Sequence, residues 1–140
     1  MIDVFSRDIL ARTIYGEARG EWARLDGGLA ALMAVGNVVL NRLRLQSWYG
    51  ATVEEVCLKP CQFSCWNKAD PNRAALEKVT ATDATFATCL RVAEALLEGR
   101  WPDVTKGATH YYSTLLATPP VWAALLTARI KIGQHLFFKA

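Results

Sequence analysis

Long apolar runs and several common catalytic motifs are missing from this sequence of 140 residues. Its longest apolar stretch, residues 29–40, is interrupted by Gly36 and Asn37 and is shorter than the roughly 20 residues that a membrane-spanning helix needs. No GxSxG, HExxH, GxGxxG or P-loop pattern occurs, and these patterns mark common hydrolase, zinc and nucleotide sites. We therefore expect no stable membrane insertion and no cofactor.

A concentrated charge of either sign is also missing. The 16 Lys and Arg residues exceed the 13 Asp and Glu residues by a net charge of +3, and they are scattered, whereas nucleic-acid-binding modules cluster them in a stripe. We expect no nucleic-acid partner, and we expect either an ordinary solvated surface or a weak preference for anionic polymers such as cell-wall glycans. With 52% hydrophobic residues, residues 1–140 fit a single folded domain.

Cysteine is sparse, and its spacing does not match the usual metal sites. The first three cysteines are four residues apart (CxxxCxxxC), unlike the paired CxxC knuckles of zinc sites. We therefore expect no metal. Buried free thiols, which pack as small apolar groups, are the expected state, and a disulfide within residues 57–65 is the alternative. The four cysteines are Cys57, Cys61, Cys65 and Cys89.

Apolar periodicity predicts three long amphipathic helices. Ser6 is a plausible N-cap of the first helix. In the second helix Gly36 lies on the apolar face, where it would let another helix approach closely, and Asn37 and Asn41 beside it would brace a neighbouring loop. The three helices are predicted over residues 3–20 or 6–20, residues 25–45 or 28–45, and residues 83–99.

The rest of the chain is less regular. Thr52 and Glu55 would cap a short helix within the irregular residues 46–72. Towards the C-terminus, residues 108–112 and 130–138 alternate like strands, with a short helix predicted over residues 121–129 between them. The two strand-like pieces predict a small antiparallel sheet. The fold class is therefore α+β and predominantly helical, with that sheet in the C-terminal part.

The stretch YGEARGE at residues 15–21 places two glutamates among glycines, directly after an apolar helical run. Leu10, Ile14 and Glu17 follow one another at helical spacing, so Glu17 lies on the stripe that the two apolar residues bury. Desolvation and a second carboxylate both help a carboxyl group to keep its proton, and Glu21 would supply that second charge. The pattern alone is consistent with a charged helix end or with a catalytic acid.

Aromatic, amide and histidine side chains crowd the non-helical parts. Sugar rings stack on aromatic faces and bond to amides, so Gln62 and Ser64 would orient a ring, although most of the aromatic residues also suit a core. His110 is consistent with a catalytic residue, a ligand or a hydrogen-bonded core residue, and His135 is expected to be structural. Cys65 and His110 together allow a cysteine peptidase acting on wall peptides. A non-catalytic glycan-binding module is the other alternative.

Six segments follow one another in a characteristic order: TIYGEARGE (13–21), AVGNVVLNR (34–42), QFS (62–64), GATHYY (107–112), Trp122 and IGQHLF (132–137). Together they resemble the SleB/CwlJ-type cell-wall hydrolases, the family that includes the spore cortex-lytic enzymes. The resemblance extends over residues 13–138. It implies a compact, lysozyme-like domain that cleaves the peptidoglycan strand at the β-1,4 bond between N-acetylmuramic acid and N-acetylglucosamine.

The same resemblance implies roles for individual residues. The first glutamate of the GEARGE-like motif is the catalytic acid of that family, and it corresponds to Glu17. The spore enzymes resemble lytic transglycosylases, which leave a 1,6-anhydro end, so that one glutamate serves as acid and then as base. No family role is carried onto His110, because spore-type sequences usually have another residue there. The expected substrate-binding residues are Tyr15, Glu21, Gln62, Ser64, His110, Tyr111 and Tyr112.

The N-terminal sequence MIDVFSRDIL has acidic residues where a secretory signal peptide has a basic and then an apolar segment. Secreted spore members carry such a peptide and often a wall-binding repeat, and neither is visible here. We therefore expect a monomer that is synthesised in the cytoplasm and acts on peptidoglycan after release. It would then resemble the phage or prophage endolysins of the family, which depend on a holin.

Overall fold

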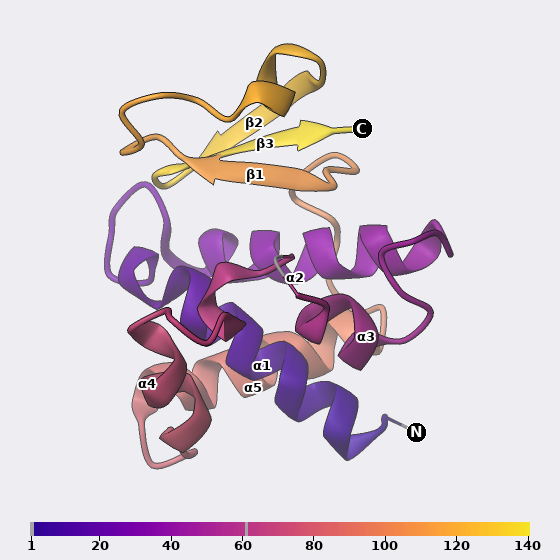
Figure 1. Cartoon of the computed structure of the whole chain (residues 1–140). Helices are drawn as coiled ribbons and strands as arrows, with labels where there is room; N and C mark the ends of the chain where they lie inside the picture. Colours follow the sequence, from indigo (N-terminus) through magenta and orange to yellow (C-terminus); the bar gives the residue numbers. More distant parts are fainter. Residues whose placement is uncertain (1, 61) are drawn as a thin grey trace.

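The computed structural model describes residues 2–60 and 62–140, and it places a small sheet over a layer of helices (Figure 1). Cys61 lies outside the described residues. The mainly helical α+β prediction is confirmed, with the sheet in the C-terminal part. The helices are α1 (Val4–Ala18), α2 (Gly28–Arg44), α3 (Val53–Leu58), α4 (Asn72–Lys78) and α5 (Ala84–Leu97), with 3-10 turns η1 (Arg19–Glu21), η2 (Ser64–Trp66) and η3 (Val121–Ala124); the strands are β1 (His110–Ser113), β2 (Thr127–Ile132) and β3 (His135–Lys139).

Side-chain caps decide where the long helices begin. The Asp3 carboxylate accepts a hydrogen bond from the Phe5 backbone N–H, so Asp3 is the N-cap of α1. The prediction of Ser6 as the cap is wrong, because Ser6 already lies inside the helix and donates its hydroxyl to Asp3. At the start of α5, Asp83 accepts from the Phe86 N–H, which confirms the predicted start of that helix.

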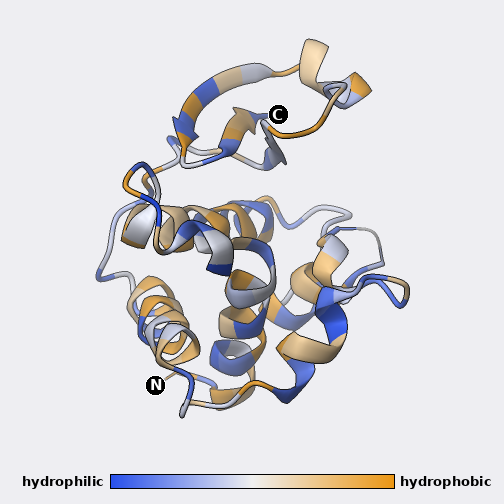
Figure 2. Cartoon of the chain, turned by 90° about the vertical axis from the view of Figure 1, so that its left-hand side faces the viewer, coloured by the Kyte–Doolittle hydropathy of each residue, from blue (hydrophilic) through white to orange (hydrophobic). Residues whose placement is uncertain are grey.

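Helix α1 packs against the other four helices of the described chain, and polar and apolar residues share the long helices as amphipathic packing requires (Figure 2). Leu10 and Ile14 of α1 are fully buried in the core. A Cβ atom at Gly36 of α2 would overlap Leu96 of α5 and lie 3.3 Å from Ile14 Cδ1. The predicted close approach of helices at this glycine is therefore confirmed.

The connection from α5 to β1 is tied to α2 by two amide side chains. Asn37 accepts a hydrogen bond of 3.0 Å from the Val104 N–H. Asn41 donates to the Asp103 carboxylate and to the Ala108 carbonyl, both at 2.9 Å. The prediction that these two asparagines brace a neighbouring loop is confirmed, and the bracing places the start of β1 against α2.

The three strands form one antiparallel sheet in the order β1-β3-β2, so the predicted sheet is confirmed. Tyr111 pairs with Phe137, and the pairing of β2 with β3 is irregular between Ala128 and Ile130. The helix predicted over residues 121–129 is shorter than expected, because the chain from Thr127 onwards pairs with β3 instead. Helix α4 is not predicted from the sequence pattern.

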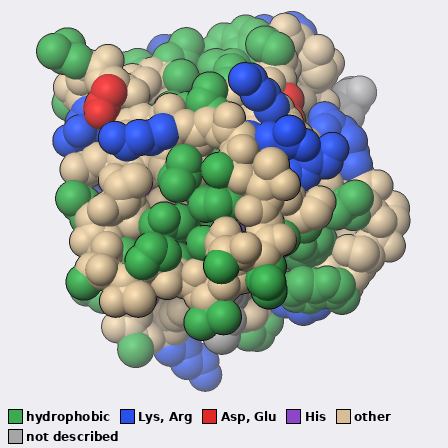
Figure 3. All heavy atoms as spheres, turned by 90° about the horizontal axis from the view of Figure 1, so that it is seen from above, with side chains coloured by type: hydrophobic (Ala, Val, Ile, Leu, Met, Phe, Trp, Pro, Cys, Tyr) green, Lys and Arg blue, Asp and Glu red, His purple; other side chains and the backbone are tan. Residues whose placement is uncertain are grey.

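The segment between β1 and β2 leaves large apolar side chains in solvent. Seen from above, the face over the sheet shows hydrophobic side chains flanked by Lys and Arg (Figure 3). Within the segment 114–126 the exposed large hydrophobic residues are Leu115, Leu116, Val121 and Leu125. Among the described residues no helix is both long and apolar enough to cross a membrane.

Candidate active site

Glu17 stands at the end of α1, where the buried stripe meets the surface. Leu10 and Ile14 are fully buried, and Glu17, at the next position of the stripe, is half-buried. The helix was expected to continue to Gly20, but it ends at Ala18 and the chain turns through η1. The carboxylate of Glu17 is therefore held at a helix end, partly open to solvent.

Three groups from two other parts of the chain point their donors at the Glu17 carboxylate. The Tyr111 hydroxyl, from β1, donates to Oε1. The Cys65 backbone N–H, from η2, donates to Oε2 at 3.1 Å, and the Ser64 hydroxyl lies 3.5 Å from the same oxygen. Both carboxylate oxygens thus have partners that fix the side chain between the helices and the sheet.

Tyr111 remains a hydrogen-bond donor across the physiological pH range. Burial raises the pKa of its hydroxyl well above the usual value, and the nearby Glu17 carboxylate raises it further. The ring packs against Phe137 at 5.2 Å and against His135 at 5.0 Å between ring centroids. The hydroxyl is therefore aimed at Glu17 by a packed aromatic cluster.

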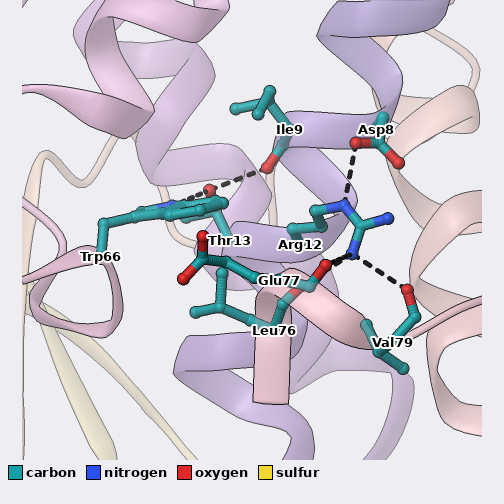
Figure 4. Close-up of polar contacts among 8 residues, drawn as sticks. All are labelled: Asp8, Ile9, Arg12, Thr13, Trp66, Leu76, Glu77 and Val79. Atoms are coloured by element: carbon teal, nitrogen blue, oxygen red, sulfur yellow. Dashed lines mark hydrogen bonds and ion pairs between the residues drawn. The ribbon is translucent and has the colours of Figure 1, made fainter. Parts of the chain in front are cut away.

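The loop that supplies Ser64 and the Cys65 N–H is fastened to α1 through the buried Thr13. The Trp66 indole N–H donates to the Thr13 hydroxyl at 2.9 Å, and that hydroxyl donates to the Ile9 carbonyl (Figure 4). Arg12, on the same helix, donates to backbone carbonyls at the end of α4 and just after it. Helix α1 thus carries Glu17 and also anchors the loop that contacts it.

A pocket of about 370 Å³ opens beside the carboxylate. It is called the Glu17 pocket below, and it brings Ser64, Tyr111 and Tyr112 of the predicted site residues together with Glu17. Among the described residues that line it, Glu17 supplies the only carboxylate. The lining consists of Gly16, Glu17, Ser64, Asn72, Tyr111, Tyr112, Ser113, Leu116 and His135.

A second pocket, of about 360 Å³, shares Tyr111 with the first. It is called the aromatic pocket below, and besides Tyr111 it contains the predicted site residues Gln62 and His110. Burial lowers the pKa of His110, and the positive charge of Arg42 lowers it further, so the ring is neutral at pH 7. The lining consists of Arg42, Trp48, Tyr49, Pro60, Gln62, His110, Tyr111 and Trp122.

Tyr15 lines neither pocket. Tyr15 lies two positions before Glu17 in the α-helix, so its side chain points about 200° away around the helix axis. The ring packs edge-on against Phe86 at 5.8 Å, and the hydroxyl lies 3.5 Å from the Asp83 carboxylate. Tyr15 therefore belongs to the core between α1 and α5, and its expected contact with substrate has no support in this geometry.

Glu21 also lines neither pocket. Its residue is 6% exposed, and its carboxylate accepts a hydrogen bond from the Gln134 N–H in the turn between β2 and β3. Arg24 lies 3.7 Å away as a charge partner. A Cβ atom at Gly133 would overlap the Glu21 side chain, and Gly133 has a φ of +58°. Glu21 thus ties the end of α1 to the sheet, which favours a supporting role over substrate contact.

Several residues of the pockets were not assigned to the site from the sequence, and Arg42 and His135 are the basic ones among them. Arg42 is 7% exposed and donates to the Thr109 carbonyl at 2.7 Å and to Gln62 at 2.8 Å. Its signal was an arginine at the end of the segment AVGNVVLNR, on the side of α2 that is buried. His135, expected to be structural, lines the Glu17 pocket, and burial lowers its pKa against the opposing charges of Glu21 and Glu17.

Three of the four cysteines are buried free thiols, which confirms that prediction for Cys57, Cys65 and Cys89. Burial raises the pKa of Cys57 and of Cys89 to about 12. The pKa of Cys65 is raised well above its usual value by burial and by the Glu17 charge. A thiol in that state is a poor nucleophile, so the arrangement disfavours the cysteine peptidase. Within residues 2–60 and 62–140, no three His, Cys, Asp or Glu side chains are arranged to hold a metal ion.

Comparisons with known proteins agree with the fold. The model of the Cell Wall Hydrolase family matches residues 28–138, which leaves Glu17 outside the matched part. The catalytic domain of SleB from Bacillus cereus is 24% identical with a TM-score of 0.67, covering 99% of this chain and 93% of that chain. The catalytic domain of the germination-specific lytic transglycosylase SleB from Bacillus anthracis is 25% identical with a TM-score of 0.70, covering 99% and 97%. No curated protein matches the chain.

The family match extends over most of the sequence, and the two structural matches cover nearly all of it. Together they confirm the resemblance found in the ordered segments and the prediction of a cell-wall-degrading enzyme. The chain belongs to the Cell Wall Hydrolase family.

Proposed function

We propose that this protein is a lytic transglycosylase that cleaves the β-1,4 bond between N-acetylmuramic acid and N-acetylglucosamine, with Glu17 as acid and base. The observation that carries the proposal is the single carboxylate in the described lining of the Glu17 pocket. A hydrolase with two carboxylates needs a partner about 5–9 Å away, and Glu21 is engaged with the Gln134 N–H instead. One carboxylate is enough when the sugar's own hydroxyl replaces water.

The proposed reaction has two steps that use the same side chain. Protonated Glu17 gives its proton to the glycosidic oxygen, and the bond from C1 of the muramic residue to that oxygen breaks. The Glu17 carboxylate then takes the proton of the C6 hydroxyl of the same residue as the oxygen bonds to C1. The products are a 1,6-anhydro end and a new free hydroxyl on the N-acetylglucosamine. Glu17 returns to its protonated form.

The neighbours of Glu17 position it and the sugars. Tyr111 and the Cys65 N–H hold the two carboxylate oxygens, so the side chain keeps its orientation through both steps. Ser64 and Tyr112 line the same pocket and offer hydroxyl groups to the substrate. Preorganised donors of this kind need no rearrangement during the reaction.

Mass spectrometry of purified peptidoglycan after digestion tests the proposal. Wild type should release anhydro-muropeptides, Glu17→Gln should release none above background, and Cys65→Ala should keep activity. Reducing ends would mean hydrolysis in place of transglycosylation. Free peptides released by Glu17→Gln but not by Cys65→Ala would mean a cysteine peptidase. Binding to walls without any released product would mean a glycan-binding module.

We further propose that the protein acts as a monomeric endolysin, which reaches the wall from the cytoplasm through a holin. The support is the sequence expectation set out above. Expression in a bacterial host with and without a co-expressed holin tests it, with Glu17→Gln as the inactive control. Lysis should require both the holin and Glu17, and lysis of equal speed without the holin would contradict the proposed route.

A further inference from the structure

The aromatic lining does not stop at the Glu17 pocket. Tyr111 belongs to the Glu17 pocket and to the aromatic pocket, so the two hollows are neighbours. Trp48 lines the aromatic pocket and also a third hollow of about 500 Å³, together with Glu54, Leu58 and Lys59. A row of hollows thus leads from the proposed acid to Trp48.

Trp48 has a largely exposed indole ring that packs against a neighbouring aromatic ring. It is 67% exposed, and its ring lies against the Tyr49 ring with centroids 4.4 Å apart and planes tilted by 33°. Tyr49 itself is buried, and the Arg42 guanidinium lies 5.1 Å from its ring centroid. The indole is therefore largely exposed to solvent while it rests on a buried support. Large aromatic surfaces exposed next to a pocket are typical of binding sites.

Polar contacts hold this aromatic pair to the buried centre of the site. Gln62 donates to the Tyr49 carbonyl at 2.7 Å and accepts from Arg42 at 2.8 Å. Arg42 also holds the Thr109 carbonyl just before β1. The Lys59 ammonium also lies 4.7 Å from the Trp48 ring centroid and donates to the Trp48 carbonyl. The indole is thus ordered before any ligand arrives, which lowers the entropic cost of binding.

We propose that Trp48 is a stacking platform for a sugar ring of the glycan strand, beyond the aromatic pocket and away from the cleaved bond. The inference rests on the proposed function, because it takes the strand that Glu17 cleaves as the occupant of the row of hollows. A pyranose has a flat apolar face that suits an indole and a polar rim that suits Gln62 and His110. A flat aromatic face flanked by a few polar groups is how ligand pockets combine affinity with orientation.

The platform predicts a dependence on strand length. The probes are glycan strands freed of stem peptides by an amidase and separated by number of disaccharides. Trp48→Ala should match wild type on the shortest strand that is cleaved and lose about tenfold in kcat/KM on long strands, through KM. Trp48→Phe should keep most of the kcat/KM that wild type has on long strands, because the phenyl ring still offers a flat apolar face. Trp22→Ala is the matched control, because Trp22 is 37% exposed and lines none of the pockets named above.

An equal loss on short and long strands, or no loss on either, would overturn the platform. A loss seen only on strands that keep their stem peptides would assign Trp48 to peptide binding and overturn it as well. Titration of long strands into Glu17→Gln and Glu17→Gln/Trp48→Ala measures the platform without cleavage, and the double variant should bind about tenfold more weakly. Failure of the proposed function would show separately, as wild type that leaves stripped strands uncut.

Discussion

The two glutamates of the motif YGEARGE lie in different surroundings although they are only four positions apart. Glu17 is half-buried at the mouth of a pocket, where a tyrosine hydroxyl and a backbone N–H hold its oxygens. Glu21 is buried in a corner, where it accepts from the Gln134 N–H and faces Arg24. Glu17 is open to a substrate, whereas Glu21 joins the helices to the sheet. Substitution of Glu17 should therefore lower activity, and substitution of Glu21 should lower stability.

The cause of the difference is the end of α1. The helix stops at Ala18 and continues as the 3-10 turn η1, so Glu21 leaves the face that carries Glu17. Had the helix continued to Gly20, as the sequence pattern predicts, the two carboxylates would have stood one turn apart. The separation removes Glu21 from the pocket and leaves a single carboxylate there among the described residues.

Glu17→Gln should have the largest effect, and it should act on activity alone. The amide keeps the size of the side chain but cannot donate and take back a proton, so kcat should fall by about 10²–10⁴-fold. The melting temperature should stay close to that of wild type, because the Glu17 residue is only half-buried. Release of anhydro-muropeptides and a thermal melt measure the two effects. Retained activity would remove Glu17 from the proposed role.

Glu21→Ala should show the opposite pattern. The Gln134 N–H would be left without its partner in a buried place, so the free energy of unfolding should fall by roughly 2–3 kcal/mol. Urea denaturation measures this loss. The kcat of the folded fraction should remain within a few-fold of wild type, since Glu21 lines neither pocket. A loss of kcat as deep as that of Glu17→Gln, with unchanged stability, would break the comparison.

Gly133→Ala tests the same corner from the sheet side. The residue has a φ of +58°, and a Cβ there would overlap the Glu21 carboxylate. Gly99→Ala is the matched control, because Gly99 has a φ of +72° with no atom near its added Cβ. Backbone strain of this kind costs about 1–2 kcal/mol at either site. Urea denaturation should show a larger loss in the free energy of unfolding for Gly133→Ala than for Gly99→Ala. Equal losses would mean that the Glu21 side chain moves away from the added Cβ without an energetic cost.

Much of the fold follows from the sequence because its signals are local. The cap at Asp83, the packing glycine at Gly36 and the amides Asn37 and Asn41 behave as their positions predict. At the start of the first helix, Asp3 and Ser6 both offer capping oxygens, and the local pattern does not show that Asp3 is the one used. Helix α4 was missed because it is short. Strand β2 was predicted too short because its first residues become a strand only through pairing with β3, which local propensity does not show.

The site follows from the sequence only in part, for the same reason. Periodicity placed Glu17 beside Leu10 and Ile14, and the resemblance gave it a role. That Tyr111 donates to Glu17 depends on how β1 crosses the end of α1, which local pattern does not show. The segment IGQHLF predicts His135 as a structural strand residue. Its place in the lining of the Glu17 pocket depends on how the sheet packs on the helices, which the local sequence does not show.

His135 allows the charges of the two glutamates to be compared directly, with the smallest expected effect. Burial lowers the pKa of His135 below its ordinary value of 6.5, and the negative charges of Glu21 and, more weakly, of Glu17 raise it. Removing either charge should therefore lower that pKa further, and Glu21→Gln should lower it more than Glu17→Gln does. Titration of the histidine ring signals by NMR measures both shifts.

The pKa of His110, which responds to burial and to Arg42, should stay unchanged in both variants and serves as the internal reference. A larger shift in Glu17→Gln would mean that His135 faces the acid more closely than the corner, and the division between the two regions would have to be redrawn.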